Sequence, residues 1–197
     1  MRAGATLILA VAVLAGCAPR EVLIGKPAEP PPGVDLSGSW TLVTDERAER
    51  RRLDEAVRRA DGVDDARIVR RVRTPDGREA TVVERRLSGG LVHVFLHHGK
   101  RLQITQTTSA LFISFDRAVV QEYRFGENRQ VRVGPVEADR VSGWEGDAYV
   151  VETLDENGVK LTERFELDRA RERLVRTIVL RARNGQTETV VQEFERQ

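Results

Sequence analysis

Three histidines lie close together in the chain, at His93, His97 and His98, and imidazole can bind zinc or act as a general base. On a helix, His93 and His97 would lie four residues apart on one face and could share a metal ion. On a strand they would stand about 13 Å apart, which is too far to chelate one ion. Because nothing else matches a catalytic zinc motif, we predict no metal site and no cofactor.

Nucleophilic hydrolysis would need a hydroxyl or thiol, a base and an orienting acid. None of the serines lies in a nucleophile-elbow pattern, and the sequence has no glycine-rich phosphate loop. Carboxylates are abundant, but their abundance alone does not make a catalytic constellation. We therefore predict no catalytic residues and expect that the protein is not an enzyme.

The single cysteine, Cys17, follows a segment that is typical of secreted proteins. Met1 and Arg2 give a short positive start, and residues 5–15 form an apolar run. This run is too short to cross a bilayer as a helix, which takes about 20 residues. It ends in the sequence Leu14-Ala15-Gly16-Cys17, which resembles the lipobox of bacterial lipoproteins.

The lipobox resemblance implies that residues 1–16 are a signal peptide, that the chain is cut before Cys17, and that Cys17 is acylated on its sulfur and its new amine. Several acyl chains anchor a protein more firmly than a single one. In diderm lipoproteins an Asp after the cysteine favours the inner membrane, so Ala18 implies an outer-membrane anchor facing the periplasm. The membrane is thus the first predicted partner.

Residues 17–35 are predicted to be the lipidated cysteine and a proline-rich tether, since five of the seven prolines lie between residues 19 and 32. Fully extended, residues 18–34 would reach about 50 Å. The apolar run Val22-Leu23-Ile24 leaves two alternatives open: it lies on the membrane surface, or it docks on the domain that follows.

Period-two alternation of apolar and polar residues dominates the C-terminal half and predicts strands with one buried face. Leu174, Ile178 and Leu180 share such a face, on which Arg176 breaks the pattern. Asn157-Gly158 and Asn184-Gly185 are typical of hairpin turns. The predicted strands are 137–144, 147–154, 159–167, 173–182 and 187–195.

Upstream, we predict a first strand at 39–44 and a hairpin that joins Leu102–Ile104 to Leu111–Phe115. A further pair is predicted between 118–125 and 129–134, turning at Gly126-Glu127-Asn128. About ten strands with short connections predict a mainly β fold, an antiparallel meander that forms a barrel or a strongly bent sheet. This domain is predicted to span residues 36–197.

Residues 45–60 are predicted to form one surface helix, because Leu53, Val57 and Ala60 recur at helical spacing and Asp45 is a suitable N-cap. The helix is either a lid packed on the sheet or a contact for a partner protein. Residues 63–100 stay open between strand, helix and loop: a polar hairpin around Pro75-Asp76-Gly77 and an unstructured segment both fit the sequence.

Gly38-Ser39-Trp40 opens the first predicted strand and resembles the Gly-x-Trp start of lipocalins, in which the Trp closes the barrel base. This resemblance implies an Arg packed over the Trp, supplied by Arg181, Arg183 or Arg196, although the Thr-Asp-x-x-Tyr segment of that pattern is absent. The wider run 35–40 together with 143–147 is similar to small β-rich envelope proteins without an assigned activity. Core or barrel-end packing is the alternative role for Trp40 and Trp144.

Two functional hypotheses follow. The first is an anchored binding module that holds an apolar or amphipathic ligand, such as a lipid, inside the barrel. The second is an envelope structural or protein-interaction module with a filled core and no ligand. With 32 basic and 31 acidic residues, the chain lacks the basic stripe that nucleic-acid binding needs, so no nucleic acid is predicted. The predicted ligand-lining residues are Trp40, Phe112, Phe115 and Phe165.

Overall fold

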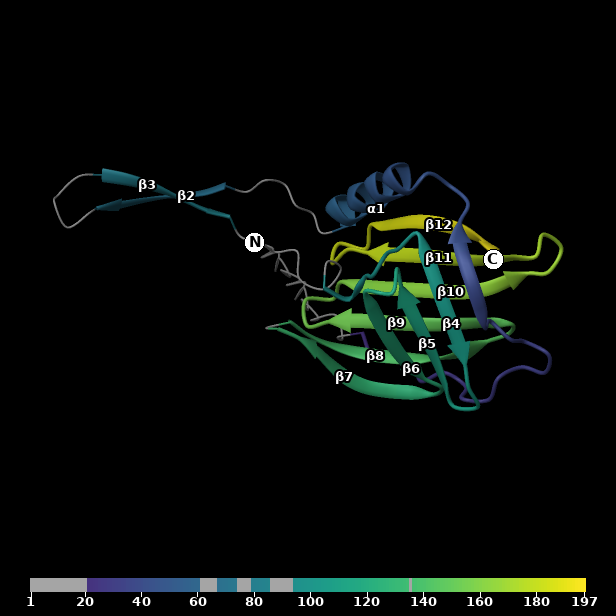
Figure 1. The fold of residues 1–197 in the computed structure, drawn as a ribbon. Helices are drawn as coiled ribbons and strands as arrows, with labels where there is room; N and C mark the ends of the chain where they lie inside the picture. The colour runs from purple at the N-terminus through teal and green to yellow at the C-terminus, as the bar shows by residue number, and fades with distance from the viewer. Residues whose placement is uncertain (1–20, 61–66, 74–78, 86–93, 135) are drawn as a thin grey trace, which may run out of the picture.

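A nearly closed antiparallel β-barrel with one helix packed against it is the main body of the molecule (Figure 1). The structure is a computed structural model that describes residues 21–60, 67–73, 79–85, 94–134 and 136–197, with backbone alone for 67–73 and 79–85. The prediction of a mainly β barrel with a helix near 45–60 is confirmed. The barrel strands are β1 (Gly38–Leu42), β4 (Arg101–Gln106), β5 (Ala110–Phe115), β6 (Val119–Arg124), β7 (Glu127–Val133), β8 (Val136–Glu145), β9 (Ala148–Asp155), β10 (Lys160–Asp168), β11 (Arg173–Arg181) and β12 (Thr187–Arg196).

The ten strands follow an up-and-down order, β6-β5-β4-β1-β12-β11-β10-β9-β8-β7. The last strand, β12, pairs antiparallel with the first, β1, with Trp40 opposite Arg196. This pairing closes the sheet on one side. The two ends of the sheet order are β6 and β7, so the barrel lacks a hydrogen-bonded ladder between these two strands. We call this opening the seam.

The predicted pairing of 118–125 with 129–134 is wrong, because β6 and β7 lie at opposite ends of the sheet order. The physical reason is Phe125, whose ring packs 5.5 Å from the ring of Trp144 and 5.4 Å from that of Tyr149. The carbonyl of Arg124 accepts hydrogen bonds from the hydroxyls of Ser142 (2.9 Å) and Tyr149 (3.3 Å). Side chains from β8 and β9 therefore bridge the seam at this end.

Helix α1 (Glu46–Ala60) covers one end of the barrel interior. Its N-terminus is capped as predicted, since the Asp45 carboxylate accepts a hydrogen bond from the backbone N–H of Ala48 at 2.9 Å. The buried face of the helix packs in one cluster with Ile178 and Leu180 of β11. The apolar residues of that face are Leu53, Ala56, Val57 and Ala60. The lid alternative for this helix therefore fits the structure.

Part of the region 63–100 forms a polar hairpin, which is one of the two alternatives that the sequence allowed. Strands β2 (Arg67–Arg73) and β3 (Glu79–Arg85) make a separate two-stranded sheet (Figure 1). Residues 94 and 95 belong to a helical turn, and residues 96–99 have no regular structure. The turn around Pro75 and residue His93 lie outside the described residues.

Residues 21–36 lie against the barrel, which revises the extended tether predicted for residues 18–34. Val34 and Leu36 are buried in the main core cluster, where Leu36 accepts a hydrogen bond at its carbonyl from the indole N–H of Trp40 (3.1 Å). Of the two alternatives for residues 22–24, docking holds for Leu23, which is buried. Cys17 lies outside the described residues. Within the described part of the chain, no helix is long and apolar enough to pass through a bilayer.

Candidate functional site

The barrel interior consists of two apolar clusters with a polar layer between them. On each of three neighbouring strands, the inward-facing residues run apolar, polar, apolar: Leu161, Glu163 and Phe165 on β10 set the pattern. The first apolar residue of each triplet belongs to the cluster beneath α1, and the third belongs to the cluster around Trp40. The other two triplets are Ile178, Arg176, Leu174 on β11 and Val190, Gln192, Phe194 on β12.

Arg176 is fully buried and fully partnered. Its guanidinium forms an ion pair with Glu163, donates to the side-chain oxygen of Gln192 at 3.2 Å and donates to the backbone carbonyl of His97 at 2.7 Å. The rings of Phe115 and Phe165 lie 5.1 and 5.5 Å from its central carbon. Arg176 thus reaches across the interior from β11 to β5, and its charge is neutralised within the protein.

Arg140, on β8, is the second guanidinium in the same layer and is only 5% exposed. Its Nε donates to the hydroxyl of Thr153 at 3.2 Å, and its guanidinium carbon lies 5.1 Å from the ring centre of Phe95 and 5.6 Å from that of Tyr123. Among the residues that the structure describes, no carboxylate lies within ion-pair distance of Arg140. The aromatic rings stabilise a cation, but they do not neutralise it.

Among the residues whose side chains are described, the polar layer carries two guanidinium groups and one carboxylate, that of Glu163. Burial raises the pKa of Tyr123 far above its ordinary value, so the phenol stays neutral. Burial also lowers the pKa of His97, so its ring is neutral at pH 7. Asp155, farther along β9, caps a turn by accepting from the backbone N–H groups of Asn157 and Val159. The described part of this layer thus has one positive charge without a matching anion.

At the barrel end opposite α1, Trp40 is packed beneath Arg196. The guanidinium carbon of Arg196 lies 4.4 Å from the centre of the indole, and one of its nitrogens donates to the carbonyl of Ser37 at 3.1 Å. Gly38 has a φ of +151°, which other residues rarely adopt, and a Cβ there would lie 2.7 Å from that guanidinium, so glycine suits this position. The arginine that the Gly-x-Trp resemblance implied is thus Arg196, and Trp40 has the core and barrel-end role.

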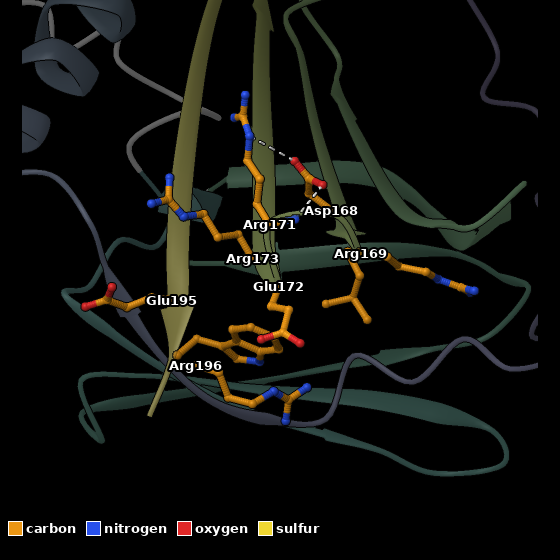
Figure 2. Close-up of a pocket in the computed structure, with 9 residues that line it drawn as sticks. Asp168, Arg169, Arg171, Glu172, Arg173, Glu195 and Arg196 are labelled. Carbon is orange, nitrogen blue, oxygen red and sulfur yellow. Dashed lines mark hydrogen bonds and ion pairs between the residues drawn. The ribbon is translucent and has the colours of Figure 1, made fainter.

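A cleft of about 570 Å³ lies beside this Trp40–Arg196 stack, at the turn between β10 and β11. Figure 2 shows charged side chains around it, among them Arg171, which pairs with Asp168 at 3.6 Å. Only Trp40 and Leu167 are apolar among its lining residues. The cleft is therefore suited to water or small polar solutes rather than to an apolar ligand.

The four predicted ligand-lining residues do not form one group. Phe115 and Phe165 point into the interior and flank Arg176, and Trp40 lies at the barrel end. Phe112 is half-buried on the outer face of β5, because residues 111, 113 and 115 take the inner positions. Two residues three positions apart cannot share one face of a regular strand, so Phe112 and Phe115 were incompatible candidates.

The polar layer was missed as a site, although its signals are present in the sequence. Arg176 interrupts an apolar face of β11. Glu163 and Gln192 interrupt the buried, inward faces of the neighbouring strands β10 and β12 in the same way. Among the described residues, no group of three His, Cys, Asp or Glu side chains is placed to hold a metal ion. His98 instead accepts a hydrogen bond at 3.0 Å from Nε of Arg50 on α1.

No protein-family model matches the chain, and no curated protein matches it either. Among solved structures it is similar to a luciferase domain from the dinoflagellate Lingulodinium polyedrum, with a TM-score of 0.50 and 14% identity over 87% of this chain and 45% of that one. It is also similar to a secretory abundant heat soluble protein from Ramazzottius varieornatus (TM-score 0.47, 9% identity, 82% and 95% covered). A third is the fluorescent protein UnaG (TM-score 0.44, 16% identity, 82% and 96% covered).

At this level of identity the likeness to the luciferase domain concerns the fold alone. The TM-score of 0.50 shows a similar arrangement of the backbone in the two structures. The chain spans less than half of the length of that luciferase structure.

Proposed function

We propose that the protein is a binding module whose barrel holds an amphipathic ligand with an anionic group. The observation that carries this proposal is Arg140, a guanidinium that is 5% exposed and has no carboxylate beside it among the described residues. Leaving a charge buried without a partner costs several kcal/mol. A ligand carboxylate, phosphate or sulfate would offset that cost, and its apolar part would contact the clusters on either side of the layer.

Native mass spectrometry of the protein produced from residue 18 onward, purified without detergent, tests this proposal. We expect an anionic small molecule to co-purify with the wild type and to be lost in Arg140→Gln. Arg124→Gln is the matched control, because Arg124 is an exposed arginine that pairs with Glu122 at 3.0 Å. A protein that stays empty after challenge with anionic amphiphiles would overturn the proposal.

One observation favours the alternative of a structural module with a filled core. Arg176 and the rings of Phe115 and Phe165 occupy the interior at the level of the polar layer. A ligand must therefore enter by moving α1 or by opening the seam between β6 and β7. If the protein stays empty in the experiment above, the alternative takes its place, with the charged outer face of α1 as the contact for an envelope protein.

We also propose that Cys17 is acylated and anchors the protein in the outer membrane, facing the periplasm. The support is the sequence Leu14-Ala15-Gly16-Cys17 after a short apolar run, followed by Ala18. Metabolic labelling with palmitate tests the anchor. The wild type is expected to be labelled and to fractionate with outer membranes, whereas Cys17→Ser is expected to lose the label. Equal labelling of both proteins would contradict the proposal.

A further inference from the structure

Residues 21–28, which we call the docked segment, cross the outer surface of β8 to β11. Glu21 forms ion pairs with Arg181 of β11 and, at 3.4 Å, with Lys160 of β10. At the other end, Lys26 forms ion pairs with Glu145 of β8 and, at 3.3 Å, with Glu152 of β9. The segment is therefore held at both ends by opposite charges.

Packing of an apolar side chain and a backbone hydrogen bond also fix the segment. Leu23 is buried with Val141 and Leu154 in a cluster of its own, separate from the two interior clusters. The carbonyl of Pro27 accepts a hydrogen bond at 3.0 Å from the backbone N–H of Trp144, beyond the end of β7. A Cβ at Gly143 would lie only 2.4 Å from that carbonyl, so the barrel surface makes room for the segment.

The opposite face of the docked segment is apolar and uncovered. The side chains of Val22 and Ile24 are 80% and 81% exposed, whereas Leu23 between them is 7% exposed. Outside β2 and β3, they are the two most exposed large hydrophobic residues of the described chain. Exposure of this extent on a segment fixed to the barrel indicates a contact surface rather than a flexible linker.

The length of chain that precedes the docked segment limits where this surface can lie. From Cys17 to Glu21 the chain spans four residues, which is about 14 Å when fully extended. An acyl group on Cys17 would therefore hold Val22 and Ile24 close to the bilayer surface. The charges on this side of the barrel are arranged as pairs of opposite sign, and the guanidinium of Arg181 lowers the pKa of Glu21, so its carboxylate is ionised at neutral pH.

We propose that the barrel lies against the lipid bilayer through the docked segment, with Val22 and Ile24 inserted at the boundary between headgroups and acyl chains. This inference rests on the lipid anchor proposed for Cys17. The outer face of β8 to β11 then faces the membrane, and β4 and β5 face the periplasm. Burial of apolar side chains drives the contact, which depends little on the charge of the lipids because the nearby charges are paired.

Site-specific fluorescence on the mature acylated protein in vesicles of phosphatidylethanolamine and phosphatidylglycerol tests this orientation. A polarity-sensitive thiol probe is attached to Val22→Cys, to Ile24→Cys or, as the control, to Thr105→Cys on β4, which is an exposed position. We expect iodide in the water to quench positions 22 and 24 at least about twofold less than position 105, and lipids with quenchers in their chains to show the opposite order.

Two results would overturn the inference, and they differ in what else they affect. Vesicles that float with the protein bound, but with iodide quenching at 22 and 24 equal to that at 105, overturn the orientation and leave the lipid anchor in place. A protein that does not float with the vesicles overturns the anchor and the orientation together.

Discussion

Arg140 and Arg176 lie in the same layer of the barrel but differ in what surrounds them. Arg176 forms an ion pair with Glu163 and uses its other donors on Gln192 and His97. Arg140 has one hydroxyl partner and two aromatic neighbours. Removing one member of a buried ion pair leaves the other charge buried without a partner, which destabilises the fold. Removing a buried charge that has no partner removes the cost of burying it.

This difference predicts opposite effects on stability in the ligand-free protein. Glu163→Gln is expected to lower the free energy of unfolding by about 3 kcal/mol, because it leaves Arg176 buried without a carboxylate. Arg140→Met is expected to leave it unchanged or to raise it by about 1 kcal/mol. Urea unfolding of the three proteins measures both values. Equal destabilisation by the two substitutions would mean that Arg140 has a counter-charge within the protein.

His97 gives the stability a pH dependence of known sign. Burial is the main cause that lowers its pKa from the ordinary value of 6.5, with Arg176, Arg140 and His98 acting in the same direction and Glu163 opposing them. The unfolded chain therefore binds a proton below pH 6.5 that the folded chain does not, and the free energy of unfolding falls as the pH falls below 6.5.

The measurement is urea unfolding at several pH values, with His97→Gln as the comparison. The wild type is expected to lose up to about 1.4 kcal/mol for each pH unit in which only the unfolded chain titrates. His97→Gln should show a smaller slope over the same range. The slope that remains includes His98, whose pKa is also lowered, mainly by burial and by Arg50, and at lower pH the carboxyl groups of Glu21 and Asp35, whose pKa values are lowered by hydrogen bonds. Identical slopes in the two proteins would rule out His97 as the source.

At the scale of elements, turn chemistry and periodicity predicted most strands, and packing decided the exceptions. The strands predicted at 147–154 and 159–167 agree with β9 and β10, because alternation and Asn157-Gly158 both favour this hairpin. The seam between β6 and β7 could not be predicted from local sequence. It depends on where the ring of Phe125 packs, which is set by residues about 20 positions away in the chain.

The docked segment is the second element that local sequence did not reveal. Its prolines favoured an extended tether. The features that allow it to dock instead are two glycines far away in the chain, which leave room for it on the barrel surface. A Cβ at Gly126 would lie 2.7 Å from the Cβ of Ala28, and a Cβ at Gly143 would clash with Pro27. Local sequence could not show that these two glycines contact residues 27 and 28, because only the fold brings them together.

The glycine contact can be tested by substitution. Gly143→Ala is expected to displace the docked segment, because its new methyl group would lie where the Pro27 carbonyl is, while the barrel stays folded. The amide of Trp144 donates to that carbonyl, so its hydrogen exchange should become faster by about tenfold or more. Gly25→Ala is the matched control, since nothing lies within 4 Å of its added Cβ. An unchanged exchange rate at Trp144 in Gly143→Ala would contradict the docking.

For the molecule as a whole, the sequence predicted the barrel but not the side-chain contacts inside it. Period-two patterning shows which residues face inward without showing which of them meet across the interior. The meeting of Arg176 with Phe115, or of Arg140 with Tyr123, joins strands that are not neighbours in the sheet. The packing of Arg196 on Trp40 could be anticipated, because that contact accompanies a recognisable Gly-x-Trp motif.

Binding of an amphipathic anion at Arg140 can be measured by calorimetric titration of the soluble protein, produced from residue 18 onward, with dodecanoate and with dodecanol at pH 8. We expect the wild type to bind dodecanoate at least about tenfold more tightly than dodecanol, and Arg140→Gln to lose this preference. Equal affinities for the two ligands in the wild type, or an unchanged preference in Arg140→Gln, would contradict the claim.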